Sequence, residues 1–345
     1  MKSSQITQAV VALYHIRRPG FVWGPPGVGK SDTIASAAEI LGEQLVQQKK
    51  IKKASEFGLI DFRMALRDPT DIKGFPMPDQ ETKTMRFFRD GELPKEGYGI
   101  LFMDELNSAA PASQAAGMQL TLTRRIGDYV LPDGWSIIGA GNRESDRGVV
   151  HRMPTPLANR MTHLDFDVNV DDWLNWAGRS NRMDPEIIAF IRFKPELLFN
   201  FNPQSADRAF ATPRSWEAVN KIMHQAKVDD ETLYAMLRDT VGEGPATELQ
   251  AFLTLIKDLP TVEDVKKDPK GLKMPDSPAT RHAIVTMLAH NTKDDALFER
   301  FMDFVTRMDK EFQVVYVRDC LNRNKAIGAN KVFTKWALEN HQLIN

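Results

Sequence analysis

The sequence predicts a three-layer α/β domain followed by a mostly helical second half. In the first half, short apolar runs alternate with amphipathic segments, which is the pattern of a mostly parallel sheet covered by helices on both faces. From about Val170 onward, the longer segments carry the apolar spacing of helices. A chain of 345 residues suits two or three domains, and we expect boundaries at 1–168, 169–230 and 231–345.

Each expected element of the first half has its own local signal. Apolar runs bounded by turn residues predict strands at 20–23, 58–64, 99–104 and 135–142. Helices are expected between them at 31–48 and at 111–124, where a proline occupies the first turn. Pro-Asp-Gly at 132–134 separates two alternating apolar runs and predicts a hairpin turn, and residues 258–278 are expected to form a long irregular connector.

Composition excludes several classes of protein. Lys and Arg total 45 against 46 for Asp and Glu, so no large basic field favours non-specific nucleic-acid binding, although a local patch is compatible with this sum. The single cysteine, Cys320, has no partner for an internal disulfide, and the N-terminus shows no secretory leader pattern. No apolar run reaches the ~20 residues of a membrane span. We expect a cytoplasmic protein.

The stretch GPPGVGKS, residues 24–31, follows an apolar strand and opens a helix. It satisfies the phosphate-loop pattern G-x-x-x-x-G-K-[ST], in which backbone N–H groups and the helix dipole bind phosphate oxygens. Lys30 would reach the β- and γ-phosphates and the Ser31 hydroxyl would bind Mg²⁺. The alternative is a glycine-rich turn that matches by chance. Agreement of strand, loop and helix favours a P-loop NTPase fold.

The run ILFMDE, residues 100–105, ends a buried strand in two carboxylates. Strand ends at the carboxyl edge of such a sheet lie beside the phosphate loop. Asp104 would hold Mg²⁺ through water, and Glu105 would orient and deprotonate the attacking water. The alternative is an acidic strand end that caps the next helix.

Several segments together resemble the AAA+ ATPases, and specifically their MoxR-like branch. They are GPPGVGKS, ILFMDELNSAAPASQAAGMQLTL, GAGN after a strand, and PLANRM; LRDPTDIKGFPMPD and MRFFRDGELP resemble branch segments, the second with a departure at its first residue. The resemblance covers about residues 15–165 and continues more loosely to TPRSW. It implies an α/β P-loop NTPase domain, an all-α lid and a helical C-terminal region.

The resemblance also implies roles for individual residues. Asn142 matches the polar sensor that positions the lytic water, and Arg214 matches the second sensor arginine of the lid, with Thr212 as its helix cap. Arg160 matches the arginine finger that a subunit presents to its neighbour; Arg143, Arg147 and Arg152 are alternatives nearby. With Glu105 these form the expected catalytic set. The residues expected to contact ATP are Gly24, Pro25, Pro26, Gly27, Val28, Gly29, Lys30, Ser31 and Asp32, and those expected at Mg²⁺ are Ser31 and Asp104.

A finger supplied in trans implies a homo-oligomeric ring, by resemblance a hexamer. MoxR-like proteins are chaperone-like remodelers that assist maturation of partner proteins, and they often work with a von Willebrand factor A domain protein. Two other functions stay open: a nucleic-acid-stimulated motor, with MRFFRD and RRIGDY as contact segments, and a nucleotide-gated scaffold with slow hydrolysis. The histidines and the cysteine do not have the spacing of a zinc site, and no motif in residues 231–345 indicates a ligand.

Overall fold

The computed structural model describes residues 1–88, 91–146, 151–179 and 182–343. They divide into two compact units, Met1–Val168 and Asn169–Asn345, each of which is described by itself. The expected further division at residue 230 stays a prediction. Within the described residues, no helix is long and apolar enough to cross a membrane.

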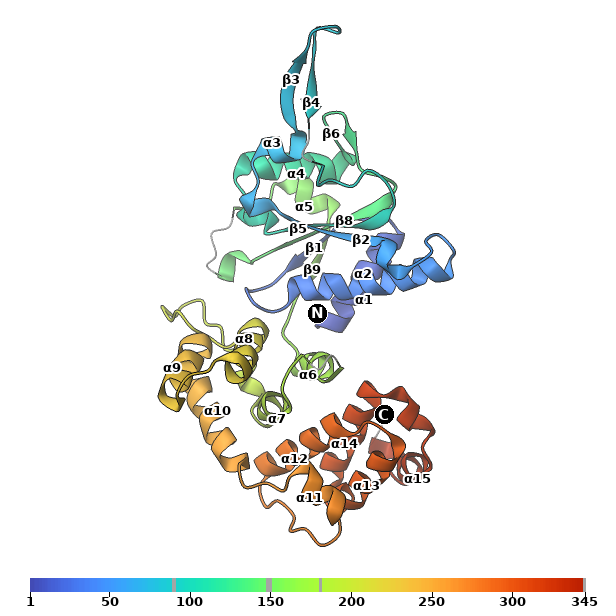
Figure 1. The fold of residues 1–345 in the computed structure, drawn as a ribbon. Helices are drawn as coiled ribbons and strands as arrows, with labels where there is room; N and C mark the ends of the chain where they lie inside the picture. Colours follow the sequence, from blue (N-terminus) through green and yellow to red (C-terminus); the bar gives the residue numbers. More distant parts are fainter. Residues whose placement is uncertain (89–90, 147–150, 180–181, 344–345) are drawn as a thin grey trace. The chain divides into compact units, whose positions relative to one another are not determined.

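The first unit is built on a five-stranded parallel sheet in the order β2-β5-β8-β1-β9. In Figure 1 helices α1 and α2 cover one face of this sheet, and α3, α4 and α5 cover the other. This arrangement confirms the three-layer α/β fold class. The strands are β1 (Gly20–Trp23), β2 (Phe57–Arg63), β5 (Tyr98–Asp104), β8 (Gly134–Gly141) and β9 (Thr162–Asp165); the helices are α1 (Ser3–His15), α2 (Lys30–Gln47), α3 (Pro69–Lys73), α4 (Pro111–Thr123) and α5 (Thr155–Arg160).

Strands β5 and β8 are buried along almost their whole length, because helices cover both faces of the sheet. Their continuous apolar runs are therefore the signal by which the sequence predicts them. Two glycines on neighbouring strands make room for the indole of Trp135. A Cβ added at Gly58 would lie 2.4 Å from that ring, and one at Gly99 would lie 2.6 Å from it.

Two small hairpins extend from this unit. Strands β3 (Phe75–Asp79) and β4 (Thr84–Phe88) form one, and β6 (Arg125–Ile126) and β7 (Tyr129–Val130) form the other. The hairpin expected at Pro132–Gly134 is wrong: the antiparallel turn is at Gly127–Asp128, where Gly127 has φ +58°. At 132–134 the Trp135 N–H donates to the Pro132 carbonyl (3.0 Å), and this turn sends the chain into the parallel strand β8 instead.

The second unit is helical, as predicted. Its central helix, α12 (Pro278–Asn291), is buried on most sides and packs against α7 (Pro185–Phe193) and α14 (Lys310–Arg323). A short helix, α11 (Val262–Lys267), interrupts the expected irregular connector and is capped by Thr261. The remaining helices are α6 (Val170–Arg179), α8 (Pro213–Gln225), α9 (Asp230–Val241), α10 (Glu243–Ile256), α13 (Asp295–Val305) and α15 (Lys331–Glu339).

Candidate nucleotide site

The glycine-rich loop joins β1 to α2, as the sequence predicts. Gly27 has φ +75° and Gly29 has φ +94°, in the left-handed region that favours glycine. Gly29 is also the N-cap of α2, so the loop feeds directly into the positive end of an 18-residue helix. Gly24 is fixed at the start of the loop by its N–H, which donates to the Gly141 carbonyl at the end of β8 (3.2 Å). The loop therefore lies at the carboxyl edge of the sheet.

The Lys30 ammonium lies inside the loop. It donates to the carbonyls of Gly24 (2.7 Å) and Pro25 (3.0 Å), and to Oδ1 of Asn142 (3.1 Å). These contacts bring together two residues that are 112 positions apart in the sequence. The amide oxygen and the ammonium therefore share the space beside the loop, where the sequence places phosphates.

Ser31 and Asp104 also come together. The Ser31 hydroxyl donates to Oδ2 of Asp104 across 3.4 Å, from the first turn of α2 to the end of β5. Both are hard oxygen ligands of the kind that Mg²⁺ prefers, and Mg²⁺ is commonly held by one or two carboxylates together with substrate phosphates. No group of three or more His, Cys, Asp or Glu side chains suited to a metal is found among the described residues. The site fits a magnesium ion held partly by its substrate.

Glu105 has an unusual backbone conformation. It is in the left-handed region (φ 54°, ψ 32°), and its N–H donates to Oδ1 of Asp104 (2.9 Å). Such a conformation costs a non-glycine residue about 1–3 kcal/mol and is concentrated at functional sites. The turn leaves Glu105 exposed, directly after a strand that is buried as far as Met103. A free carboxylate is thus available at the same edge as the loop.

Asn107 is a positioning residue that the sequence reasoning missed. It is buried, its Nδ2 donates to the Asn142 carbonyl (2.7 Å), and its own carbonyl accepts from the His151 N–H (2.7 Å). A Cβ at Gly141 would lie 1.8 Å from Oδ1 of Asn107, so only glycine permits this approach. The signal in the sequence is an amide side chain two positions after Glu105, directly after the apolar Leu106. Asn107 holds the end of β8 against the turn after β5.

A second link joins the loop to α5. Trp23, the last residue of β1, donates from Nε1 to Nδ1 of His163 (2.8 Å), and Nε2 of His163 lies 2.8 Å from the Ala158 carbonyl. Because an indole N–H only donates, Nδ1 accepts and Nε2 carries the proton that is donated to Ala158. The strand end next to the loop is therefore tied to the helix that ends at Arg160.

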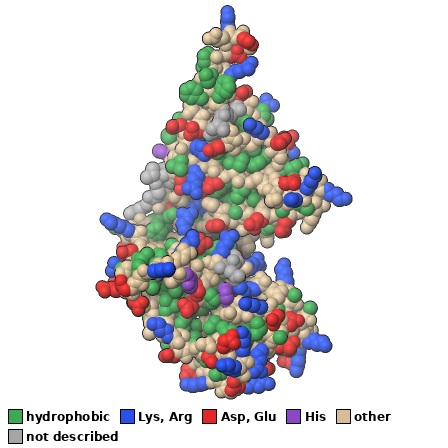
Figure 2. Space-filling view, viewed as in Figure 1, with side chains coloured by type: hydrophobic (Ala, Val, Ile, Leu, Met, Phe, Trp, Pro, Cys, Tyr) green, Lys and Arg blue, Asp and Glu red, His purple; other side chains and the backbone are tan. Residues whose placement is uncertain are grey.

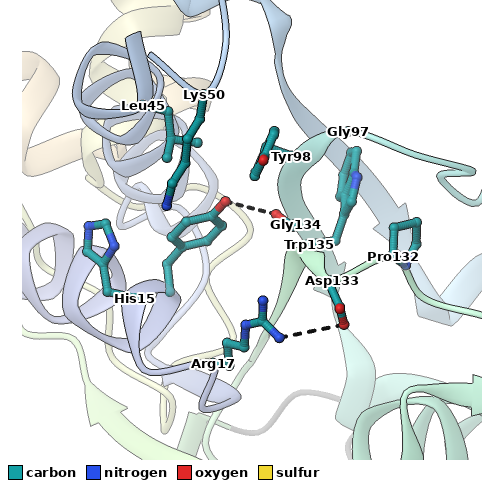
Figure 3. A pocket seen from close by; sticks show the side chains of 11 residues that line it. His15, Arg17, Leu45, Lys50, Gly97, Tyr98, Pro132, Asp133, Gly134 and Trp135 are labelled. Carbon is teal, nitrogen blue, oxygen red and sulfur yellow. Dashed lines mark hydrogen bonds and ion pairs between the residues drawn. The ribbon is translucent and has the colours of Figure 1, made fainter. Parts of the chain in front are cut away.

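A cavity of about 480 Å³ lies at the other edge of the sheet, where β5 and β8 begin (Figure 3). The Tyr14 hydroxyl donates to the Gly134 carbonyl there (2.8 Å), and burial raises the pKa of Tyr14 to about 12. Arg17 pairs with Asp133 on its rim (3.5 Å). The cavity contains none of the predicted nucleotide residues and is separate from the loop.

A family model matches residues 21–168, and its description is ATPase family associated with various cellular activities (AAA). This part of the chain is therefore similar to the AAA ATPases. The matched segment contains the loop, both carboxylates, Asn142 and Arg160.

Similar solved structures share 14–15% identity with the chain. The match with NtrX from Brucella abortus in complex with ADP covers 94% of this chain and 67% of the NtrX chain, with a TM-score of 0.40. The match with a RuvB mutant from Thermotoga maritima covers 77% of this chain and 74% of the RuvB chain, with a TM-score of 0.37. The match with PCH-2 from C. elegans covers 83% of this chain and 67% of the PCH-2 chain, with a TM-score of 0.32. No curated protein matches the sequence.

The candidate finger arginines of the first unit differ in their surroundings. Arg143 is bound within its own subunit, by Asp165 (3.2 Å), Asp167 (3.4 Å) and the Phe166 carbonyl (3.1 Å). Arg160 is exposed at the end of α5, Arg152 is exposed in the preceding coil, and Arg147 lies outside the described residues. Arg143 is therefore held by contacts within its own chain, whereas Arg152 and Arg160 are exposed.

Arg214 belongs to the second unit. It is exposed in the first turn of α8, after Pro213. Thr212 caps this helix as expected, because its hydroxyl accepts from the Ser215 N–H (3.0 Å). Trp216, two residues further, is fully buried in the second unit and its indole donates to the Leu197 carbonyl (2.9 Å). The indole anchors the turn that carries Arg214, whose sensor role stays a prediction.

Proposed function

We propose that this protein hydrolyses ATP in a ring of identical subunits of the MoxR-like type and uses the energy to remodel or mature a partner protein. The observation that carries the proposal is the convergence at one edge of the sheet. The loop lysine, the loop serine, two carboxylates and a polar sensor come from three strand ends and lie beside the same loop.

Each of these residues has a distinct task. The loop N–H groups and Lys30 bind the phosphates, and Asn142, which already contacts the Lys30 ammonium, orients the attacking water. Glu105 accepts the proton of that water as general base. A magnesium ion at Ser31 and Asp104 would neutralise charge on the phosphates.

Arg160 serves the site of a neighbouring subunit in this proposal. It ends α5 two residues before Thr162, and Thr162 pairs with Gly20, the first residue of β1. Arg160 also lines a small cavity with Pro19 and Ser136, which lie at the starts of β1 and β8. It is thus about one strand length, roughly 10 Å, from its own loop. In the proposal this exposed arginine reaches a loop on another subunit, where it would stabilise transition-state charge.

The remaining assignments follow from the same proposal. A finger in trans requires an oligomer, for which we propose a hexamer, and Arg214 would sense the nucleotide from the lid. Opening and closing of the lid would convert hydrolysis into movement between subunits. The partner would be a protein, possessing or accompanied by a von Willebrand factor A domain.

The experiment that tests the proposal is steady-state ATP hydrolysis per subunit, with Mg²⁺, over a wide range of protein concentration. A specific rate that rises as subunits associate supports a shared site. Absence of turnover at every concentration overturns the enzymatic part of the proposal. Stimulation by single- or double-stranded DNA, and not by unfolded protein, would favour the nucleic-acid motor instead.

A further inference from the structure

The β3–β4 hairpin is the feature of the first unit that the proposed chemistry does not use. It is inserted between α3 and β5 and, among the described residues, its two strands pair only with each other. Figure 1 shows it standing out from the layers of the first unit. Each strand therefore has an outer edge that pairs with nothing in the sheet.

The two outer edges are chemically different. Pro76 lies opposite Phe87, and Pro78 lies opposite Met85. Opposed residues in an antiparallel pair alternate between those that exchange two hydrogen bonds and those that exchange none, and a proline has no N–H to exchange. These two pairs are therefore the non-bonded ones, in which backbone groups point away from the partner strand.

It follows that β4 has an open edge and β3 has a blocked one. The N–H and C=O groups of Met85 and Phe87 point outward along β4, and no backbone partner for them occurs in the part of the chain described here. The corresponding positions of β3 are Pro76 and Pro78, which offer no donor. Only β4 can accept a further strand through alternating donors and acceptors.

The hairpin also carries exposed apolar side chains. Phe75 (65% exposed), Met77 (49%) and Phe88 (61%) share one face, because they belong to the bonded pairs, and Met85 (54%) is exposed on the other face. Figure 2 shows hydrophobic side chains gathered over this hairpin. Exposed apolar clusters of this kind mark interaction surfaces.

Charge on the hairpin is balanced. Arg86 shares the face of Phe75 and Phe88, but it pairs with Asp79 across the hairpin (2.6 Å). Nucleic acid is bound mainly by cations that neutralise its phosphates, and among the described residues of the two strands the one cation, Arg86, is already paired. An extended polypeptide with apolar side chains matches both the open edge and the apolar face.

We propose that β4 binds an extended, apolar segment of the partner protein as an added third strand, with its side chains against Phe88. This inference rests on the proposed function, because it names how that partner is held. Backbone pairing at Met85 and Phe87 would give affinity for many sequences, and the apolar face would select unfolded segments over folded surfaces.

The test is binding of a fluorescently labelled unfolded protein, reduced and carboxymethylated α-lactalbumin, measured by anisotropy with the full-length chain. Met85→Pro removes one outward N–H and Met85→Ala keeps it. The backbone proposal predicts that Met85→Pro weakens binding about fivefold or more relative to Met85→Ala, which corresponds to one lost hydrogen bond. Phe88→Ser, which reduces the apolar face, is expected to weaken binding as well.

The outcomes separate this inference from the proposed function. Equal binding by Met85→Pro and Met85→Ala overturns the added strand, as does preference of the hairpin for a labelled single-stranded DNA. ATP hydrolysis without client is measured on the same variants and is expected to stay at the wild-type rate. If hydrolysis is intact and the variants bind alike, the hairpin inference alone fails; if the wild-type chain does not hydrolyse ATP, the proposed function fails.

Discussion

At the scale of single residues, Glu105 is the side chain whose loss would be most specific. Its side chain is exposed and its backbone N–H, which donates to Oδ1 of Asp104, is kept in Glu105→Gln, so this change removes the base and keeps the shape. We expect ATP turnover to fall about 10²–10⁴-fold, the usual contribution of a general base. Binding of a fluorescent ATP analogue should change little. Equal loss of binding and turnover would show that Glu105 acts through structure instead.

Gly141 is where the backbone of the site is most sensitive. A Cβ there would lie 1.8 Å from Oδ1 of Asn107, whose Nδ2 holds the Asn142 carbonyl. We expect Gly141→Ala to displace Asn142 and to lower ATP turnover at least tenfold, because misplaced catalytic groups lose orientation. The matched control is Gly178→Ala, where an added Cβ meets nothing within 4 Å. The control should keep wild-type turnover and gain stability of up to about 1 kcal/mol.

At the scale of elements, α12 carries a histidine that makes stability depend on pH. Burial, and secondly the charge of Arg192, lower the pKa of His282 from 6.5 to about 4, and its Nδ1 has no partner. The unfolded chain therefore binds a proton between pH 6.5 and 4 that the folded chain does not. The free energy of unfolding is expected to fall as pH is lowered through this window.

Urea denaturation at pH 7, 5.5 and 4.5 measures this effect. His282→Phe should make the fall shallower, because phenylalanine takes up no proton and can pack against Phe312, whose ring is 4.9 Å from that of His282. His341→Gln at an exposed position is the control. An unchanged slope in His282→Phe would contradict the assignment.

A buried ion pair joins three helices of the second unit. Arg192 of α7 donates to both carboxylate oxygens of Asp319 on α14 (2.8 and 3.0 Å) and to the Thr286 hydroxyl on α12 (2.5 Å). Asp319→Ala would leave a charge that is 94% buried without its partner, which costs about 3–5 kcal/mol. Thermal or urea unfolding measures the loss. The control is Asp303→Ala, which removes an exposed pair with Lys270 and should cost less than about 1 kcal/mol.

The elements also show which strands and turns the sequence alone predicts. Strands β1, β5 and β8 were predictable because their burial requires the apolar runs that identify them, and the edge strand β2, with only Phe57 and Phe62 buried, was predictable from a similar apolar run. The turn at Gly127–Asp128 was not, because Pro132–Gly134 is the stronger turn signal and its actual use depends on tertiary pairing of β8. Asn107 was missed for a related reason: its role depends on a hydrogen bond to Asn142, which is 35 residues away in the sequence.

At the scale of the whole molecule, the parallel sheet separates the two groups of residues that the proposal combines in one site. Its carboxyl edge carries the loop, Asp104 and Glu105, while its amino edge carries Arg160. The same strand direction that makes the nucleotide loop predictable places Arg160 at the opposite edge of the sheet from its own loop. A complete site is expected only between subunits.

The most direct measurement of this claim is ATP hydrolysis by mixtures of two inactive variants. Glu105→Gln retains Arg160 and Arg160→Ala retains Glu105, so each alone lacks one half of every site. Mixed subunits should regain activity, because some interfaces then combine an intact Glu105 with a neighbour's Arg160. Activity that stays at the level of the separate variants, or full activity of Arg160→Ala by itself, would contradict the shared site.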